Sequence, residues 1–469
     1  MESKPKPSEG GQESGYGKTA TMQDKDDTGS IVRATARPEP NPDDPREWSW
    51  VESSVWTDRM LAALGNGVQG GKWHSLIDKV YASQTLWAAW RRVAANHGAA
   101  GIDRMSVERF EANAEYYLNA MGQELRNGSY KPAPIRRVYI PKGKGKTRPL
   151  GIATVKDRIV QGALKLVLEP IFEKEFLPVS FGFRPECSCK DALRIVDRSL
   201  KDGFTWVVDA DLQSYFDTIP KQGLMELVKG RVSDVNVLRL LQRFLDQQVI
   251  EGMKHWTPVA GTPQGSVISP LMANLYLHGL DEMVSSDEHK YVRFADDFVV
   301  MCRTRREADQ VLVTIQDWVD KHSLVLHPDK THVGNCVEQG QGFEFLGYRF
   351  EAGRRWSRLK SRKALRDKIR LLTGRTRSGS LESIIAELNP ILRGWFGYFM
   401  HAHRSTFRDV DGFVRRRLRA LLRKREKRPG FGRTSSDHRR WPNAFFAQHG
   451  LFTLHEAHAV ASQPRKGNC

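Results

Sequence analysis

The stretch "YVRFADDFVV" at residues 291–300 places two adjacent carboxylates, Asp296 and Asp297, among residues that favour buried β-strands. Aspartate is disfavoured in strands, and a buried carboxylate without a partner costs on the order of several kcal/mol or becomes protonated. A hairpin turn is the simplest interpretation, because aspartate is a common turn residue. A turn alone does not explain why both charges interrupt an apolar strand pair, so we looked for a second group of charges that would meet them.

A second acidic strand is expected at "FTWVVDADL", residues 204–212. Alternation along a strand puts Asp209 and Asp211 on one face, and an aromatic pair follows shortly after. Beside the 291–300 hairpin, this strand would gather Asp211, Asp296 and Asp297. Close carboxylates repel one another unless cations neutralise them, and hard oxygen ligands that share a site with phosphates favour Mg²⁺. Two Mg²⁺ ions can activate an attacking 3′-hydroxyl and stabilise a leaving pyrophosphate, which is the chemistry the pattern predicts.

The positive charge of the chain is concentrated in one segment. The net charge is +18, and residues 351–440 alone contain 26 Lys and Arg against 8 Asp and Glu, so the rest of the chain is neutral. A solvated helix surface would mix both signs, whereas charge gathered in this way indicates a polyanionic partner.

Composition excludes several classes of protein. No apolar run approaches the ~20 residues of a membrane span, so no membrane partner is expected. The N-terminus has no apolar signal segment, and the five cysteines form no C-x-x-C pair. We therefore expect a reduced, cytoplasmic protein without a structural metal.

Periodicity divides the 469 residues into five parts. Residues 1–47 contain almost no large apolar side chains, so a disordered tail is predicted over 1–50, and residues 51–135 are predicted to be helical. Strands and helices alternate over 136–352, and residues 353–428 are helical and basic. Residues 429–469 form a short final part that is rich in aromatic side chains. Within the third part we expect two strands around the basic turn of 136–152, one strand at 343–350, and a helix over 271–284 capped by Ser269.

The motifs follow the order found in reverse transcriptases encoded by group II introns, and the chain resembles that family over roughly residues 75–465. Each motif is weak alone, but the ordered set is specific. The motifs are "NHGAAGID" (96–103), "IPKGKGKTRPLGI" (140–152), "SFGFRP" (180–185), "DADLQSYFD" (209–217), "GTPQGSVISPLMANLYL" (261–277), "YVRFADDFVV", "LHPDKT" (326–331), "FEFLGY" (343–348) and "LNPILRGWFGYF" (388–399).

The resemblance implies an α+β, right-hand polymerase fold. It assigns a helical N-terminal extension to 51–135, fingers and palm to 136–352, and a helical thumb or maturase domain to 353–428. A short nucleic-acid-binding region without an endonuclease domain is expected over 429–469.

The resemblance also implies a function. The chain would be an RNA-directed DNA polymerase that binds its group II intron RNA as a maturase, and it would promote splicing and retrohoming by target-primed reverse transcription. Its partners would be the intron RNA in a ribonucleoprotein, an RNA template with a DNA primer or target DNA, and dNTPs, in the bacterial cytoplasm near the nucleoid; a homodimer is left open. Two alternatives remain: a host-adapted, defence-type reverse transcriptase without an intron, and an RNA-binding splicing cofactor whose polymerase has decayed.

The same resemblance gives roles to individual residues around the metals. Asp211, Asp296 and Asp297 would hold two Mg²⁺ ions, helped by the backbone of Leu212. Lys330 would protonate the leaving pyrophosphate, although a lysine in "HPDK" is also ordinary turn chemistry.

A further group of residues would bind the incoming nucleotide together with Leu212. Lys142 and Arg148 would hold its triphosphate as a point charge and a bidentate fork. Phe216 would lie against the sugar and disfavour a 2′-hydroxyl, unless it is simply a core residue. Gln264 and Gly265 would let a base pair approach closely.

The stretch "DGFVRRRLRALLRKREKR" (411–428) is predicted to be a helix with a basic outer face that neutralises RNA phosphates. The side chains expected to bind RNA are Arg415, Arg416, Arg417, Arg419, Arg423 and Lys424.

Overall fold

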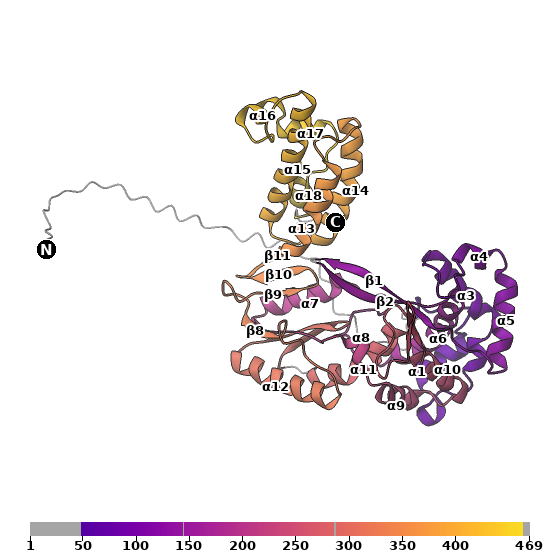
Figure 1. Cartoon of the computed structure of the whole chain (residues 1–469). Coiled ribbons are helices and arrows are strands. Elements are labelled where there is room, and N and C mark those ends of the chain that lie inside the picture. Colours follow the sequence, from indigo (N-terminus) through magenta and orange to yellow (C-terminus); the bar gives the residue numbers. More distant parts are fainter. Residues whose placement is uncertain (1–47, 144, 286–287, 463–469) are drawn as a thin grey trace, which may run out of the picture.

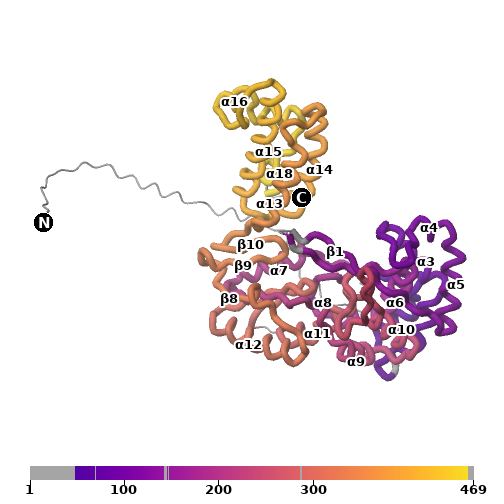
Figure 2. The backbone as a smooth tube through the Cα atoms, viewed as in Figure 1, coloured from indigo at the N-terminus to yellow at the C-terminus, as the bar shows by residue number. Residues whose placement is uncertain are grey.

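The computed structural model describes residues 48–143, 145–285 and 288–462 of the chain. Figure 1 shows a lobe made of α13–α18 that stands apart from a larger body, which contains most of the sheet structure. The backbone tube in Figure 2 follows the same arrangement, with α3, α4 and α5 at the end of the body away from this C-terminal lobe. The predicted helices before residue 130 are present: α1 (Asp58–Asn66), α2 (Ile77–Val80), α3 (Ser83–Ala95), α4 (Val107–Glu111) and α5 (Ala114–Arg126).

The predicted strand pair around the basic turn is confirmed and belongs to what we call the hairpin sheet. Strands β1 (Ile135–Gly143) and β2 (Lys146–Ile152) pair in antiparallel fashion, from Arg136 opposite Ile152 to Gly143 opposite Lys146. β1 also pairs in parallel with β4 (Val249–Glu251), which pairs with β5 (Lys254–Trp256), giving the order β2-β1-β4-β5. The long hairpin therefore projects from a small, four-stranded base.

The second sheet, which we call the central sheet, contains both acidic segments. Its strand order is β6-β7-β3-β8, from β6 (Lys290–Phe294), β7 (Asp297–Cys302), β3 (Trp206–Asp211) and β8 (His332–Asn335). All of its neighbouring strands are antiparallel. The interior of β3 is buried on both faces, since Val208 and Ala210 join one hydrophobic core and Val207 joins another.

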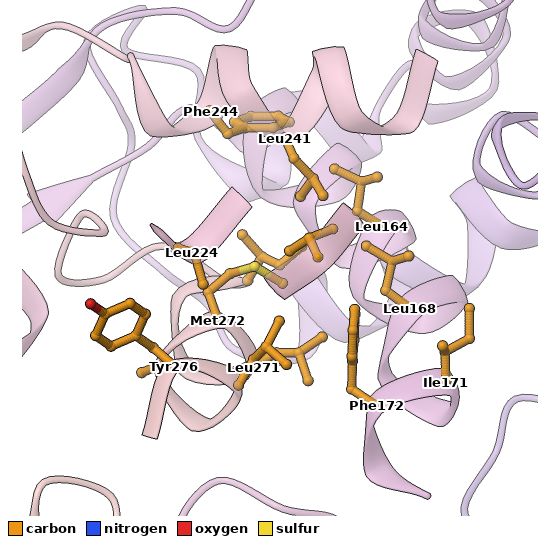
Figure 3. Close-up of a cluster of buried hydrophobic side chains, with 14 of the residues drawn as sticks. Leu164, Leu168, Ile171, Phe172, Leu224, Leu241, Phe244, Leu271, Met272 and Tyr276 are labelled. Carbon is orange, nitrogen blue, oxygen red and sulfur yellow. The ribbon is translucent and has the colours of Figure 1, made fainter. Parts of the chain in front are cut away.

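The first core lies between the central sheet and the helices of the body. It contains α6 (Val155–Glu173), α9 (Lys221–Arg231), α10 (Val235–Leu245), α11 (Ser269–Val284) and α12 (Arg305–Lys321). Figure 3 shows Leu164, Leu168 and Phe172 of α6 facing side chains of α10 and α11. Most residues of α6 are buried, including the polar side chains of Asp157, Gln161, Glu169 and Glu173.

The second core joins the central sheet to the C-terminal lobe. Side chains of β6 and β7 pack there against α7 (Cys189–Lys201), the small third sheet and the long helices of the lobe. The lobe consists of α13 (Leu359–Leu372), α14 (Leu381–Phe399), α15 (Arg404–Arg425), α16 (Ser435–Arg440), α17 (Asn443–Gln448) and α18 (Leu454–Ala461). None of the helices within the described ranges is long and apolar enough to cross a membrane.

Two local predictions were wrong. The single strand expected at 343–350 is two strands, β9 (Phe343–Phe345) and β10 (Tyr348–Glu351), because Leu346 and Gly347 turn the chain with positive φ angles of 47° and 85°. With β11 (Arg354–Ser357) they form the small sheet, in the order β11-β10-β9. Ser269 does not cap α11 but is its first residue, and its hydroxyl donates to the carbonyl of Pro263 at 3.0 Å.

Candidate active site

The three carboxylates singled out in the sequence meet at one end of the central sheet. Asp211 ends β3, Asp297 begins β7, and the two residues are direct partners in the antiparallel register. Asp296 lies in the two-residue turn between β6 and β7, where Ala295 has a left-handed φ of 61°. The amide of Leu212 donates to the carbonyl of Asp296 at 3.4 Å, so the end of β3 and the turn are also linked through the backbone.

The electrostatics of this sheet end show that the negative charges are crowded. Burial raises the pKa of Asp297 well above its usual value, and the charges of Asp209, Asp211 and Asp296 raise it further. Burial also raises the pKa of Asp296, again with a contribution from Asp211. Lys330, which follows "HP" in the predicted turn, forms an ion pair with Asp211. The side chain of Lys330 is half-exposed, whereas that of Asp211 is mostly buried.

Asp209 shares its face of β3 with Asp211 but has different surroundings. Burial raises the pKa of Asp209 to about 7, and a backbone hydrogen bond from Glu344 in β9 opposes that shift. The small sheet therefore covers Asp209, while Asp211 stays at the open end of the strand.

Within the described ranges, no three His, Cys, Asp or Glu side chains converge closely enough to hold a metal ion as they stand. The donor set of Asp211, Asp296 and Asp297 nevertheless fits Mg²⁺, because all three offer carboxylate oxygens and their repulsion is relieved by a divalent cation. Burial is the main cause of the raised pKa values of Asp296 and Asp297, and the neighbouring carboxylates add to it. Lys330 pairs with Oδ2 of Asp211, and Oδ1 is the other oxygen that could bind a cation.

A buried network that the sequence interpretation missed supports the turn from behind. Arg293 of β6 is fully buried and donates to both carboxylate oxygens of Asp281 in α11, at 2.6 and 2.5 Å. Its third nitrogen donates to the carbonyl of Ala295 and to the side-chain oxygen of Asn274, both at 3.0 Å. Because breaking a buried ion pair costs roughly 3–5 kcal/mol, this arginine fixes the backbone of the turn firmly. The sequence did contain a signal for this network, because an arginine inside the buried run "YVRF" needs a buried acidic partner.

Gly182 of "SFGFRP" is the second missed feature, and it lies directly against the same turn. A Cβ atom at this position would fall 2.9 Å from the carbonyl carbon of Phe294 and 3.0 Å from Cα of Ala295. The carbonyl of Gly182 accepts a hydrogen bond from Asn274 at 2.8 Å. The motif thus supplies a residue without a side chain exactly where the carboxylate turn has to pass, and Phe183 beside it has its ring against Phe216 with centroids 6.2 Å apart.

The residues expected to bind the nucleotide lie between the hairpin sheet and the end of β3. Arg148 of β2 is exposed, and its Nε donates to Gln264 at 3.1 Å. Phe216 is half-buried in the short helix α8 (Tyr215–Thr218). Gly265 has a φ of 99° and faces the carbonyl of Gly151, so only glycine fits there without strain. Lys142 lies in β1, but its side chain is outside the part of the chain that the structure describes.

The basic helix differs from its prediction. It extends over Arg404–Arg425 and is covered on two sides, by α13 and by α18. Arg419 is buried and donates to the carbonyl of Trp441 at 2.9 Å, so it does not lie on the outer face as predicted. Arg423 forms an ion pair with Asp437, and its contact with RNA stays a prediction. The reason is that the C-terminal helices pack on this face and use the arginines as hydrogen-bond donors.

The remaining basic side chains of α15 are more accessible. Arg417 is half-buried and donates to the carbonyl of Thr373 at 2.7 Å, which ties α15 to α13. Arg415 and Arg416 are half-exposed, and Lys424 is exposed. Two like-charged neighbours, Arg433 and Arg370, lie near Arg416 and, after burial, help to lower its pKa. Positive charge held together in this way favours a polyanion.

Comparison with known proteins agrees with this architecture. Residues 140–350 match the family "Reverse transcriptase (RNA-dependent DNA polymerase)", and residues 362–441 match "Group II intron, maturase-specific domain". Protein YkfC of Escherichia coli is 35% identical over 288 residues, which cover 53% of this chain and 75% of YkfC. The group II intron-encoded protein LtrA of Lactococcus lactis is 37% identical over 210 residues, which cover 44% of this chain and 34% of LtrA. Nuclear intron maturase 2 of Arabidopsis thaliana is 24% identical over 365 residues, 66% of this chain and 48% of that protein.

The fold and the matched domains define a reverse transcriptase, an RNA-dependent DNA polymerase of α+β, right-hand architecture, as the sequence predicted. The chain belongs to the family of group II intron-encoded reverse transcriptases, which carry a maturase-specific domain after the polymerase. Enzymes with this polymerase domain use Mg²⁺ in catalysis. The alignment spans about one third of the length of LtrA.

Proposed function

We propose that this chain copies RNA into DNA from the 3′-hydroxyl of a primer and also binds a group II intron RNA to promote its splicing and retrohoming. The observation that carries the polymerase half is the register of the central sheet, which brings Asp211 and Asp297 opposite each other with Asp296 in the adjoining turn. Three carboxylates held at a strand end by a buried arginine network have no evident structural purpose, because burial and neighbouring charges both disfavour the ionised forms of Asp296 and Asp297 unless cations are bound.

In this proposal, two Mg²⁺ ions, when bound, would activate the 3′-hydroxyl of the primer and neutralise charge on the leaving pyrophosphate. Asp211, Asp296 and Asp297 hold these ions, assisted by the backbone of Leu212. Arg148 and Lys142 bind the triphosphate of the incoming dNTP, and the ring of Phe216 lies beside its sugar and excludes a 2′-hydroxyl.

Lys330 has two tasks in the same scheme. Its ammonium group pairs with Asp211 before the metals bind, which limits the repulsion among the carboxylates. The same ion pair places Lys330 at the carboxylate end of the site, where it would donate a proton to the leaving pyrophosphate as a general acid.

The maturase half rests on the basic C-terminal lobe. Residues 351–440 carry the whole net charge of the chain, and Arg415, Arg416 and Lys424 are the predicted RNA-binding side chains of α15 that are not engaged by the neighbouring helices in the way Arg419 and Arg423 are. Phosphate contacts of this kind give strong, salt-dependent and largely sequence-independent binding. Particular intron contacts would add specificity to that general attraction.

The test is primer extension on an RNA template with dNTPs and Mg²⁺, together with binding of a group II intron transcript. Asp296→Ala removes a metal ligand that no neighbour replaces, so extension should fall by several orders of magnitude while the RNA dissociation constant stays within about twofold. Asp329→Ala is a suitable control, because it removes a carboxylate from the "HPDK" turn next to the site without touching the three assigned ligands. Extension by Asp296→Ala at near wild-type rates would overturn the assignment. A wild-type protein that binds and splices the intron but extends no primer would instead indicate a splicing cofactor.

A further inference from the structure

A chain of three side chains connects the palm to the nucleotide site. The carboxylate of Asp217 accepts a hydrogen bond from Nε2 of Gln264 at 2.8 Å. The other end of the same amide, Oε1, accepts from Nε of Arg148 at 3.1 Å. Gln264 therefore bridges a carboxylate in α8 and a guanidinium group in β2, two elements that are far apart in the sequence.

The chemistry of the two ends fixes the orientation of the amide. A carboxylate can only accept and a guanidinium group can only donate, so the NH₂ of Gln264 has to face Asp217 and its oxygen has to face Arg148. Both bonds involve an ionised group, and such bonds are about twice as strong as neutral ones. Because Arg148 donates to Gln264 through Nε, its two terminal nitrogens can still donate together to a phosphate group.

The loop that carries Gln264 is held closely on both sides. The amide of Gly261 donates to the carbonyl of Ile219 at 2.8 Å, and that of Thr262 donates to the carbonyl of Phe216 at 2.7 Å. A Cβ atom on Gly261 would lie 2.8 Å from the backbone of Asp217. On the far side, the amide of Gly151 donates to the carbonyl of Gln264 at 2.8 Å. Because these contacts fix the backbone of the loop, the orientation of the Gln264 side chain depends on its two hydrogen-bond partners, Asp217 and Arg148.

Asp217 also lines a cleft that contains a second charged side chain, Arg137. It lines a cavity of about 250 Å³ together with Arg137, Trp256 and Gln264. The guanidinium group of Arg137 lies 5.1 Å from the ring centroid of Trp256, so it is already engaged by a cation–π contact. Burial raises the pKa of Asp217, whereas Arg137 and the hydrogen bond from Gln264 act in the opposite direction.

We propose that Asp217 is a positioning residue of the nucleotide site, which acts through Gln264 to hold the fork of Arg148 toward the triphosphate of the incoming dNTP. This inference rests on the proposed polymerase function. Asp217 touches neither the nucleotide nor the metals in this scheme. Its removal frees the amide to rotate, which weakens the hold on Arg148 and therefore weakens dNTP binding rather than the chemical step.

Single-nucleotide incorporation on a primed RNA template tests this, with kcat and the KM for dNTP measured separately. Asp217→Ala should raise the KM about tenfold, the effect of one charge-assisted hydrogen bond, and leave kcat within about twofold. Asp217→Asn should raise it less, because its amide oxygen still accepts from Gln264. Glu226→Ala, which removes an exposed carboxylate of α9 paired with Lys229, is the matched control and should leave the KM unchanged.

The double variant Asp217→Ala/Gln264→Ala separates action through Gln264 from a general loss of structure. If Asp217 acts through Gln264, the double variant has the KM of Gln264→Ala alone, because two residues in one chain of bonds are not additive. Independent, multiplying effects would overturn the inference, and so would a wild-type KM in Asp217→Ala. If Asp217→Ala does not fold, Asp217→Asn/Gln264→Ala takes its place: the inference predicts the KM of Gln264→Ala alone, and a KM higher by the separate effect of Asp217→Asn, or an Asp217→Asn KM raised as much as that of Gln264→Ala, overturns it. Failure of the wild-type protein to extend any primer would refute the polymerase proposal itself, which is a different result.

Discussion

Replacing Gly182 by alanine introduces one methyl group against the turn that carries the carboxylates. The new Cβ atom would lie 2.9 Å from the carbonyl carbon of Phe294 and 3.0 Å from Cα of Ala295, and closer still to the amide nitrogen of Ala295. Ordinary contacts between such atoms are about 3.5–4.0 Å, and the closest contact decides the shift, so one of the two segments has to move by roughly 1 Å.

Neither segment can move freely. The amide of Phe181 donates to the carbonyl of Arg293 at 2.9 Å, and the amide of Arg293 donates to the carbonyl of Val179 at 2.8 Å. Asn274 holds the carbonyl of Gly182 on one side and accepts from Arg293 on the other. The displacement is therefore transmitted to the turn, and with it to Asp296.

A misplacement of about 1 Å at a reacting centre can cost about 100-fold in rate, which is the loss of extension that we expect for Gly182→Ala. The assay is single-turnover nucleotide incorporation with a saturating primer–template, accompanied by the thermal midpoint and by intron RNA binding. Gly230→Ala is the control, because its Cβ would meet nothing within 4 Å in α9. Intact RNA binding with a wild-type incorporation rate in Gly182→Ala would refute the argument that this contact sets the position of the turn.

Three further predictions follow from single features of the structure. Phe216→Ala should lower the ratio of dNTP to rNTP incorporation, because the half-buried ring no longer occupies the space beside the sugar; an unchanged ratio at normal activity would return Phe216 to a core role. Replacing Arg416 and Lys424 together by Gln should make the log–log salt dependence of intron RNA binding shallower by about 1.4–1.8 units, and parallel lines would mean that neither side chain meets a phosphate. Burial raises the pKa of Asp157 to about 6, so the folded state binds this proton more tightly than the unfolded chain and the associated stability is lost as the pH rises through 6. The difference in thermal midpoint between Asp157→Asn and wild type should therefore shift in favour of the variant when the pH is raised from 5 to 8. The same difference at both pH values would contradict this prediction.

Local patterns in the sequence determined the strands and the order of the motifs. The alternation in "TWVVDAD" predicted which face of β3 carries Asp209 and Asp211, and the basic turn between two apolar runs predicted β1 and β2. These features depend on residues close in sequence, whose spacing alone fixes the direction of the side chains. The concentration of positive charge in residues 351–440 is likewise a property of composition, and it indicated the polyanionic partner before any fold was known.

Only the tertiary structure decided which charges are available and which are used internally. Arg419 and Arg415 lie on the same predicted helix, yet Arg419 is buried because a segment more than twenty residues later, around Trp441, packs over it. Arg293 of β6 forms its ion pair with Asp281 of α11. Gly182 is required only because the turn between β6 and β7 packs directly against it. Long-range contacts of this kind leave no periodic signal in a single chain. The sequence could therefore name the carboxylates of the site, but it could not name the arginine, the asparagine and the glycine that hold their turn in place.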